Sequence, residues 1–246
     1  HEAAFYGKVN EDEYGQAFIQ DLKKANIAYK GVIKKNDLPT GCCNILVSPD
    51  GERTMATHIG IGSQLHPDEL TEDSLQGIDH IYMESYLWDH DLTKQTLKKV
   101  GRIAKTMKIE TSLSLSDPFC VDRHRDELKE FIEEYVNLVF CNFDEAKMFA
   151  QSETMADVSA FFQSFGKKIA MTASAEGAYF FHGETISHQP AQNIDQVIDT
   201  TGAGDNFAAG FLDQYLSEKT IDEALAQGNA RAGEVIQQLG PRIKRH

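Results

Sequence analysis

The feature that most constrains the fold of this chain is an alternation of short β-type runs with helix-type patterns. The β-type runs lie at residues 81–84, 111–116, 138–142 and 169–172, and segments with apolar residues at helical spacing lie between them. Strands that alternate with helices usually form a parallel sheet with helices on both faces. The sequence therefore predicts an α/β fold with a mainly parallel central sheet.

A different pattern covers approximately residues 31–59. Within it, GCCNILVSPDGERTMAT reads as two extended segments around Pro49-Asp50-Gly51, with no crossover helix. This pattern predicts a small antiparallel β lid on the main sheet. Because the chain has no internal repeat, low-complexity tract or Pro/Gly linker, we expect residues 1–246 to form a single domain.

Charge and composition exclude some classes of partner. Lys and Arg number 24 against 38 Asp and Glu, a net charge of −14, which argues against binding to nucleic acid or to an anionic membrane surface. No apolar run approaches the roughly 20 residues that span a bilayer. The four cysteines form no C-x-x-C pair, a pattern typical of reduced thiols in a cytoplasmic protein.

The stretch IDTTGAGDNFAAGFL, residues 198–212, predicts a turn between an extended segment and a helix. Phe207, Phe211 and Tyr215 recur at helical spacing just after two glycines. Glycines allow a sharp bend, and the first N–H groups of a helix lie at the positive end of its dipole. Such a turn can hold an anion, although the same residues could simply cap a helix after a tight corner.

Two well-known glycine motifs do not fit this stretch. Phe207 stands where G-x-G-x-x-G needs its third glycine, and no Gly-Lys-[Ser/Thr] follows any glycine loop. DTTGAGDNFAAGFL instead closely resembles the second signature of the ribokinase-like, or PfkB, family of carbohydrate and nucleoside kinases. This resemblance implies a ribokinase-like three-layer fold with a small β lid.

Other segments agree with this resemblance in order and spacing. NFDE, residues 142–145, resembles the N-x-x-E element of the family, and MTASAEGAYFF resembles its nucleotide-holding strand and loop. The segments DGERTMATHIG, MESYLWD and LSLSDPFCVDRHR resemble the bacterial adenosine-kinase-like branch. The likeness implies a nucleotide site at Thr172, Ser174 and Gly177.

The resemblance also implies the reaction, which moves the terminal phosphoryl group of ATP to a hydroxyl of an adenosine-like nucleoside or a sugar. Gly202, Ala203 and Gly204 would form the anion hole for the phosphate. Asp205 would accept the hydroxyl proton, and its alternative role is to cap the helix. Asn142 and Glu145 would organise Mg²⁺ through water, or alternatively only begin a helix.

The C-terminal segment predicts a helix over residues 221–239. Thr220 and Glu223 form a capping box, and a Gly-Pro pair follows the segment. Gly228 and Gly233 are unfavourable inside a helix, so something must approach closely there. The resemblance places the adenine pocket beside this helix and makes Asn229 a candidate base contact; close packing against the Asp205 helix is the alternative.

The sequence says less about the residues that would bind the phosphate acceptor. The family holds sugar hydroxyls with an N-terminal Asp and a Gly-Gly-x-x-x-Asn loop, but this chain has no Gly-Gly pair, so we expect it to lack the N-terminal segment of the family pattern. A sugar kinase and a nucleotide-binding fragment without turnover are the alternatives to a nucleoside kinase. The resemblance also implies a homodimer formed through the lid. Arg53 and His58 on the lid are interpreted as solvated polar residues. The cluster of Asp117, Arg123, His124 and Arg125 is interpreted as the polar start of a helix rather than a catalytic set.

Overall fold

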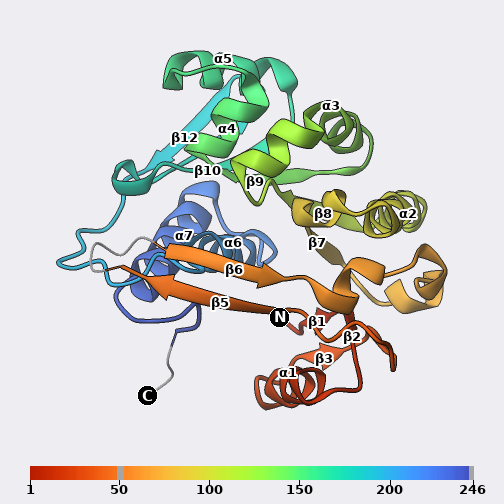
Figure 1. Ribbon diagram of the computed structural model, residues 1–246. Coiled ribbons are helices and arrows are strands. Elements are labelled where there is room, and N and C mark those ends of the chain that lie inside the picture. The colour runs from red at the N-terminus through yellow and green to blue at the C-terminus, as the bar shows by residue number, and fades with distance from the viewer. Residues whose placement is uncertain (49–52, 244–246) are drawn as a thin grey trace. The chain divides into compact units, whose positions relative to one another are not determined.

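The computed structural model describes residues 1–48 and 53–243, which divide into two compact units (Figure 1). The first unit comprises His1–Ile45, Met55–Ile81 and Leu87–Ile109. The second comprises Leu46–Thr54, Tyr82–Tyr86 and Glu110–His246. The Pro49-Asp50-Gly51 turn lies outside the described residues, and the single domain stays a prediction.

A six-stranded sheet supports the candidate site. Its strand order is β12-β11-β10-β9-β8-β7, in which β8, β9 and β10 are parallel and β11 and β12 are antiparallel to their neighbours. The strands are β7 (His80–Glu84), β8 (Glu110–Ser114), β9 (Leu138–Asn142), β10 (Lys168–Thr172), β11 (Ala178–His182) and β12 (Thr185–Gln189). The predicted α/β fold is confirmed, and all four predicted β-type runs lie on strands of this sheet, which is mixed.

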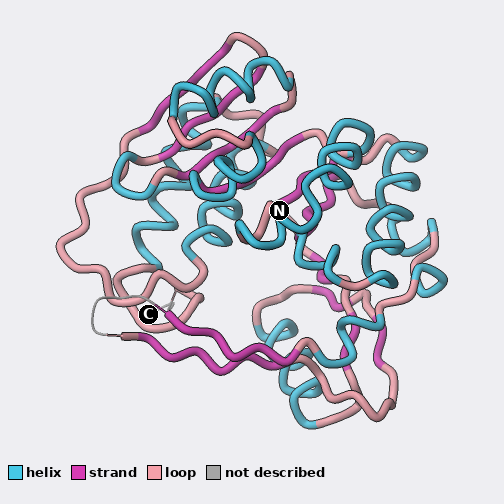
Figure 2. Tube along the Cα trace, turned by 45° about the horizontal axis from the view of Figure 1, so that its top comes forward, coloured by secondary structure: helices cyan, strands magenta, loops and turns pink. Residues whose placement is uncertain are grey.

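Helices of the second unit cover both faces of this sheet (Figures 1 and 2). They are α3 (Pro118–Tyr135), α4 (Phe143–Ala150), α5 (Met155–Phe165), α6 (Ala203–Tyr215) and α7 (Ile221–Val235). Leu138 and Phe140 of β9 pack in one core cluster with residues of α6 and α7. On the opposite face, the ring of Phe162 in α5 lies 5.4 Å from the ring of Phe181 in β11. Side chains that alternate along each strand therefore fill two separate layers.

Helices α6 and α7 approach each other so closely that glycines are needed between them. A Cβ atom added to Gly210 would lie 2.7 Å from the carbonyl oxygen of Gln227, and one added to Gly228 would lie 2.7 Å from the ring of Phe207. Real Cβ atoms essentially never show contacts this short. Of the two explanations for the glycines of α7, close packing against the Asp205 helix therefore accounts for Gly228.

Helix α7 is shorter than the sequence predicted. Its capping box is confirmed, because the side chains of Thr220 and Glu223 each accept a hydrogen bond from the backbone N–H of the other. The helix ends at Val235 rather than at Leu239. The carbonyl of Ile236, which follows, is bonded by backbone N–H groups from outside the helix.

The first unit contains short strands and two long helices. The strands pair in parallel as β1 (Ala4–Phe5) with β3 (Ala28–Tyr29) and β2 (Lys8–Val9) with β4 (Val32–Ile33). The helices are α1 (Glu13–Lys24) and α2 (Asp91–Met107). Asp12 caps α1 by accepting the N–H of Gly15 at 2.8 Å and also accepts the N–H of Thr40 at 2.7 Å.

Two further strands form a small antiparallel sheet of their own. They are β5 (Cys42–Val47) and β6 (Arg53–His58), which run in opposite directions in Figure 1. The side chains of β5 are exposed up to Leu46. β4 lies within the range predicted for the lid but pairs with β2 instead. Within the described ranges, no helix is long and apolar enough to cross a membrane.

We predict that Gly210→Ala lowers the free energy of unfolding, by about 1–3 kcal/mol as is usual for overpacked cores. The added methyl group would collide with the backbone of α7, which outweighs the higher helix propensity of alanine. Chemical denaturation measures the change. Gly204→Ala is the matched control on α6, because its Cβ would meet nothing within 4 Å. Equal stability of the Gly210→Ala and wild-type proteins would contradict the proposed packing constraint.

Candidate active site

Acidic side chains gather where strands of the central sheet end. Glu84 is the last residue of β7, Asp117 follows β8, and Glu145 follows β9 by three residues. The negative charges of Asp117 and Glu84 both raise the pKa of Glu145, and the charge of Asp205 raises the pKa of Glu84. Electrostatic effects of this kind require proximity. The structure therefore brings Asp205 and Glu145 into one acidic cluster with Glu84 and Asp117.

Asn142 and Glu145 form a capping box at the start of α4. The Oδ1 of Asn142 accepts the N–H of Glu145 at 2.8 Å, and Oε2 of Glu145 accepts the N–H of Asn142 at 2.9 Å. The side-chain amide of Asn142 also donates to Oε1 of Glu145 at 2.7 Å. Asn142 and Glu145 therefore do begin a helix, as the alternative interpretation expected. The capping box also holds the Glu145 carboxylate in one orientation.

Glu145 is 5% exposed, and burial is the largest cause that raises its pKa, to about 7. The hydrogen bond from the Asn142 backbone opposes this rise, while the charges of Asp117, Glu84 and Asp144 add to it. Within residues 1–48 and 53–243, no group of three or more His, Cys, Asp or Glu side chains is arranged to hold a metal ion directly.

Glu84 is a site residue that the sequence reasoning did not single out. Ser116 donates its hydroxyl proton to Oε2 of Glu84 at 2.7 Å, and Ser116 in turn accepts the N–H of Ser85 at 3.0 Å. Burial raises the pKa of Glu84, Ser116 and Tyr82 oppose this through hydrogen bonds, and Asp205 adds to it. The signal in the sequence was an acidic residue at the end of a β-type run, in MESYLWD.

The glycine turn lies directly before α6, as predicted. Gly202 is the N-cap residue with φ 78°, a left-handed conformation, and its carbonyl accepts the N–H of Asn206 at 2.9 Å. The N–H of Ala203 donates to the carbonyl of Thr200 at 3.2 Å, so an anion there would compete with that bond. Asp205 is exposed and lies in the first turn of α6. The turn and the candidate base therefore belong to one helix N-terminus.

The predicted nucleotide residues lie near the ends of β10 and β12. Thr172 ends β10, and Ser174 begins a short 3-10 turn with φ 49°. Gly177 has φ 98°, and a Cβ there would lie 2.1 Å from the carbonyl oxygen of Gln189. The Asn229 amide donates to that carbonyl at 2.9 Å. Gly177 and Asn229 thus hold one backbone segment, and their contact with a nucleotide stays a prediction.

Two large aromatic side chains are exposed near the carboxyl ends of β7 and β8. Phe119, in the first turn of α3, is 75% exposed, and Tyr86 is 44% exposed. The Tyr86 hydroxyl donates to the carbonyl of Ser116 at 3.0 Å. The next residue, Asp117, caps α3 by accepting the N–H of Cys120 at 2.8 Å. Tyr86 thus lies two residues after Glu84 of the acidic cluster, and Phe119 lies two residues after Asp117.

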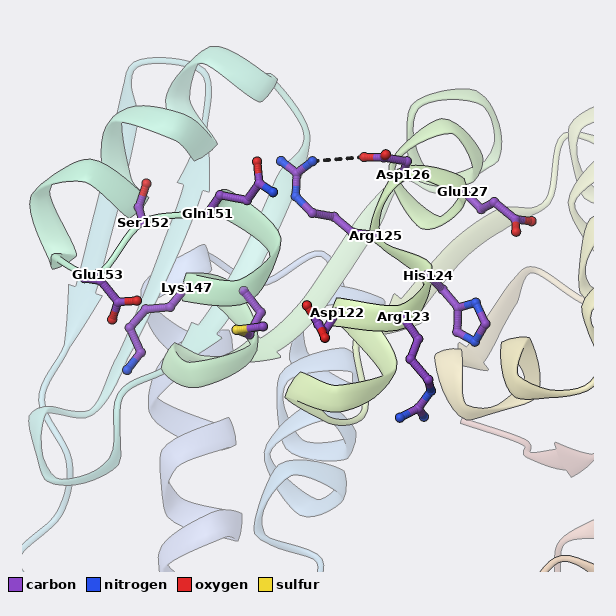
Figure 3. Close-up of a pocket in the computed structure, with 11 residues that line it drawn as sticks. Asp122, Arg123, His124, Arg125, Asp126, Glu127, Lys147, Gln151, Ser152 and Glu153 are labelled. Carbon is purple, nitrogen blue, oxygen red and sulfur yellow. Dashed lines mark hydrogen bonds and ion pairs between the residues drawn. The ribbon is translucent and has the colours of Figure 1, made fainter.

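Among the other polar candidates, Asp117 caps α3 and belongs to the acidic cluster, whereas Arg123, His124 and Arg125 line a groove. This groove has a volume of about 340 Å³ and lies between α3 and α4. Side chains of both charges line it (Figure 3). Arg125, at this groove, donates from Nε to the carbonyl of Phe149 at 2.7 Å and lies 3.1 Å from Asp126, so it supports the end of α4. His58 is exposed on β6, and the side chain of Arg53 lies outside the described residues.

Comparison with known proteins shows which proteins this chain is similar to. The family model described as pfkB family carbohydrate kinase matches residues 1–245. An uncharacterized sugar kinase of Archaeoglobus fulgidus is 26% identical over 242 residues, which are 98% of this chain and 94% of the relative.

Solved structures give closer matches. The crystal structure of adenosine kinase from Sinorhizobium meliloti is 36% identical, with a TM-score of 0.94 over 98% of this chain and 74% of that chain. A probable sugar kinase from Rhizobium etli is 35% identical, with a TM-score of 0.93 over 98% of this chain and 73% of that chain. With a family match over nearly its whole length, this protein belongs to the pfkB family of carbohydrate kinases and is an ATP-using phosphotransferase that acts on a nucleoside or a sugar.

Proposed function

We propose that this kinase transfers the terminal phosphoryl group of ATP to a hydroxyl of a nucleoside, with Asp205 as the proton acceptor. The observation that carries the proposal is the position of Asp205, exposed in the first turn of α6 and directly after the Gly202 turn. One helix N-terminus thereby offers both an anion site and a carboxylate. Phosphoryl transfer needs these two groups near the same reacting atoms.

The anion site would work through backbone donors. We propose that N–H groups of Gly202, Ala203 and Gly204 face the terminal phosphate, together with the N–H of Asp205. The positive end of the helix dipole favours the negative charge that spreads over the phosphate oxygens during transfer. Donors fixed by the fold need no reorganisation when this charge develops, so they stabilise the transition state more than flexible donors would.

Asp205 would act at the acceptor hydroxyl. A carboxylate at a helix N-terminus is favoured in its ionised form, which a proton acceptor requires. Asp205 is exposed, whereas Glu145 is buried and Glu84 is partly buried, so Asp205 is the most accessible of these three carboxylates. We therefore assign proton acceptance to Asp205 and leave the two less exposed groups to organise the surroundings.

The acidic cluster also fits a divalent cation. The charges that raise the pKa of Glu145 come from neighbouring carboxylates, and a bound cation would relieve this repulsion. Both carboxylate oxygens of Glu145 are already hydrogen bonded to Asn142, which favours contact through water. We propose that Asn142 and Glu145 hold the hydrated ion. Mg²⁺ bound there would neutralise charge on the phosphates of ATP.

We further propose that the nucleotide lies along the ends of β10 and β12. Thr172 and Ser174 are near the surface there, and Gly177 lets the chain turn close to Gln189. Because the Asn229 amide nitrogen is engaged by the Gln189 and Pro190 carbonyls, a base contact from Asn229 would use its side-chain oxygen. The lid-mediated homodimer and the cytoplasmic location stay predictions from the sequence.

The exposed rings of Phe119 and Tyr86 favour a nucleoside acceptor over a free sugar. A large exposed aromatic side chain costs hydration free energy unless it meets a partner, and a nucleobase offers a flat surface for stacking. Each ring lies two residues after a carboxylate of the acidic cluster, Tyr86 after Glu84 and Phe119 after Asp117. The name of the Sinorhizobium meliloti structure, adenosine kinase, agrees with this choice of acceptor class.

We predict that Asp205→Asn lowers kcat by about 100-fold or more, because a general base contributes at least that much, while ATP binding persists. Steady-state turnover and titration with ATP measure the two effects. Asp213→Asn is the matched control, since Asp213 is an exposed carboxylate further along the same helix. Turnover that persists in Asp205→Asn would remove Asp205 from the mechanism.

A second prediction concerns pH in metal-free buffer. The pKa of Glu145 is about 7 in the folded state and 4.5 without the fold, so between these values the folded protein binds more protons. The free energy of unfolding should therefore fall as pH rises from 4.5 to 7. Glu145→Gln keeps the capping box and should flatten this slope in denaturation experiments from pH 4.5 to 8.

The control for this slope is Glu223→Gln, which alters the exposed capping box of α7. Hydrogen bonds from Thr220 lower the pKa of Glu223, so its contribution has the opposite sign. Identical slopes in wild type and Glu145→Gln would show that Glu145 does not titrate as described. If Glu145 also organises the cation, Glu145→Gln should need more Mg²⁺ for half-maximal turnover.

The acceptor class is tested by a product search. We expect the protein, given Mg²⁺, ATP and a mixture of adenosine, other nucleosides, ribose and fructose, to yield one dominant nucleoside monophosphate in mass spectrometry. A phosphorylated sugar instead would favour the sugar kinase. Bound nucleotide without any product would favour a nucleotide-binding fragment.

For the dominant nucleoside, Phe119→Ala should raise KM by about 5-fold to 100-fold, the usual loss when a stacked base loses its aromatic partner. The KM for ATP should not change. Phe119→Tyr keeps the ring and serves as the control, so it should behave like the wild type. An unchanged nucleoside KM in Phe119→Ala would remove this ring from acceptor recognition.

A further inference from the structure

The chain beyond α7 lies against the glycine turn before α6. We call residues 236–242 the C-terminal strap. The carbonyl of Ile236 accepts the N–H of Ile198 at 2.8 Å and the N–H of Asp199 at 3.3 Å. The segment that enters the turn is therefore bonded to the first residue of the strap, and both belong to the second unit.

A buried carboxylate makes the second connection. Asp199 is 2% exposed, and its Oδ1 accepts the N–H of Thr201 at 2.8 Å and the Thr201 hydroxyl at 2.6 Å. Its Oδ2 accepts the N–H of Gly240 at 2.9 Å. One side chain thus holds the turn with one oxygen and the strap with the other. A buried carboxylate requires such partners, because an unpaired buried charge is very costly.

The strap also touches the turn directly. A Cβ atom added to Gly202 would lie 2.7 Å from Cβ of Pro241 and 2.9 Å from its Cα. Gly202 is therefore glycine for two reasons, its left-handed φ of 78° and the presence of the strap. The strap packs against the backbone of the residue that caps α6.

Asn206 of α6 also bonds both the turn and the strap. Its side-chain nitrogen donates to the carbonyl of Gly202 at 2.8 Å and to the carbonyl of Pro241 at 2.9 Å. The Gly202 carbonyl and the Ala203 N–H belong to one planar peptide unit, so holding the carbonyl also fixes this N–H, which donates to the Thr200 carbonyl at 3.2 Å. The turn that precedes the N–H groups of Gly204 and Asp205 is thereby held in place. The two donors of one amide thereby link the strap to the first peptide of α6.

We propose that Asn206 is a positioning residue for phosphoryl transfer, which clamps the C-terminal strap onto the Gly202 turn and so orients the donors that hold the terminal phosphate. The proposal rests on the proposed role of this turn. Asn206 does not touch the substrate; it acts through the Gly202 peptide. Asp205, one residue earlier in the helix, remains available to the acceptor hydroxyl.

The identity of the residue supports this role. Asparagine is a poor helix former, and alanine at an ordinary helix position would be more favourable. The Asn206 amide nitrogen instead uses both of its hydrogen atoms in the two carbonyl contacts. Small displacements of groups that position a substrate have large kinetic effects, so a loosened turn should impair catalysis even when the helix persists.

The first test is Asn206→Ala in the full chain. We expect kcat/KM for ATP to fall about tenfold or more, because the phosphate donors lose their fixed orientation. The KM for the acceptor should stay unchanged. Leu239→Ala is the matched control within the strap, since that side chain is 62% exposed, and it should leave both KM values and kcat at wild-type levels.

A second variant keeps the proposal testable if Asn206→Ala does not fold. Pro241→Gly keeps the carbonyl to which Asn206 donates, but it removes the ring that lies against Gly202 and the fixed φ of proline, so the strap should loosen there. It should therefore impair kcat/KM for ATP and leave the KM for the acceptor unchanged, as Asn206→Ala does. In the double variant the two losses should not multiply, because both changes loosen the same attachment of the strap to the Gly202 turn. Losses that multiply fully would show that Asn206 and Pro241 act independently, which would overturn the clamp.

Other outcomes separate this inference from the proposed function. Wild-type values of kcat and ATP KM in Asn206→Ala would overturn the clamp while Asp205→Asn still tests the base. A fall in kcat that matches a smaller folded fraction, with both KM values unchanged, would reduce Asn206 to a structural role and also overturn it. An active Asp205→Asn protein would instead refute the proposed function itself.

Discussion

The close contact between α6 and α7 is the constraint on which the candidate site depends. Gly210 and Gly228 let the two backbones approach, and Phe207 and Phe211 of α6 pack edge-on to Phe140 of β9 at 6.4 and 5.5 Å between ring centroids. Interiors packed at this density leave little freedom to move a helix as a whole. The N-terminus of α6 is therefore held in a defined direction, and the glycine turn and Asp205 are held with it.

The acidic cluster places negatively charged groups close together in partly buried surroundings. Burial raises the pKa of both Glu84 and Glu145, and each also feels the negative charge of another carboxylate. A fold gains no stability from placing like charges together in partly dry surroundings. Such arrangements are instead common at functional sites, where a ligand or ion supplies the missing charge. We interpret the cluster as a site whose electrostatics are completed by the bound substrates and their cation.

Several residues that define this site act on the backbone rather than on a ligand. Asn229 and Gly177 hold the segment around Gln189, while Asp199 and Asn206 hold the turn before α6. A phosphate bound by backbone donors depends on the direction of peptide planes, which side chains from distant parts of the chain set. This explains why many polar groups near the turn are already hydrogen bonded within the protein.

The sequence by itself determined the α/β class, the four predicted runs of the central sheet, the capping box at Thr220, and the glycine turn before α6. These features follow from local periodicity, cap chemistry and backbone freedom, which each residue carries with it. Only the tertiary structure decided that Glu84 joins the acidic cluster, that Gly177 and Asn229 meet at Gln189, and that α7 ends at Val235 so that a strap reaches Gly202. Those outcomes depend on contacts between residues tens of positions apart, and a single sequence does not record which distant groups will face each other.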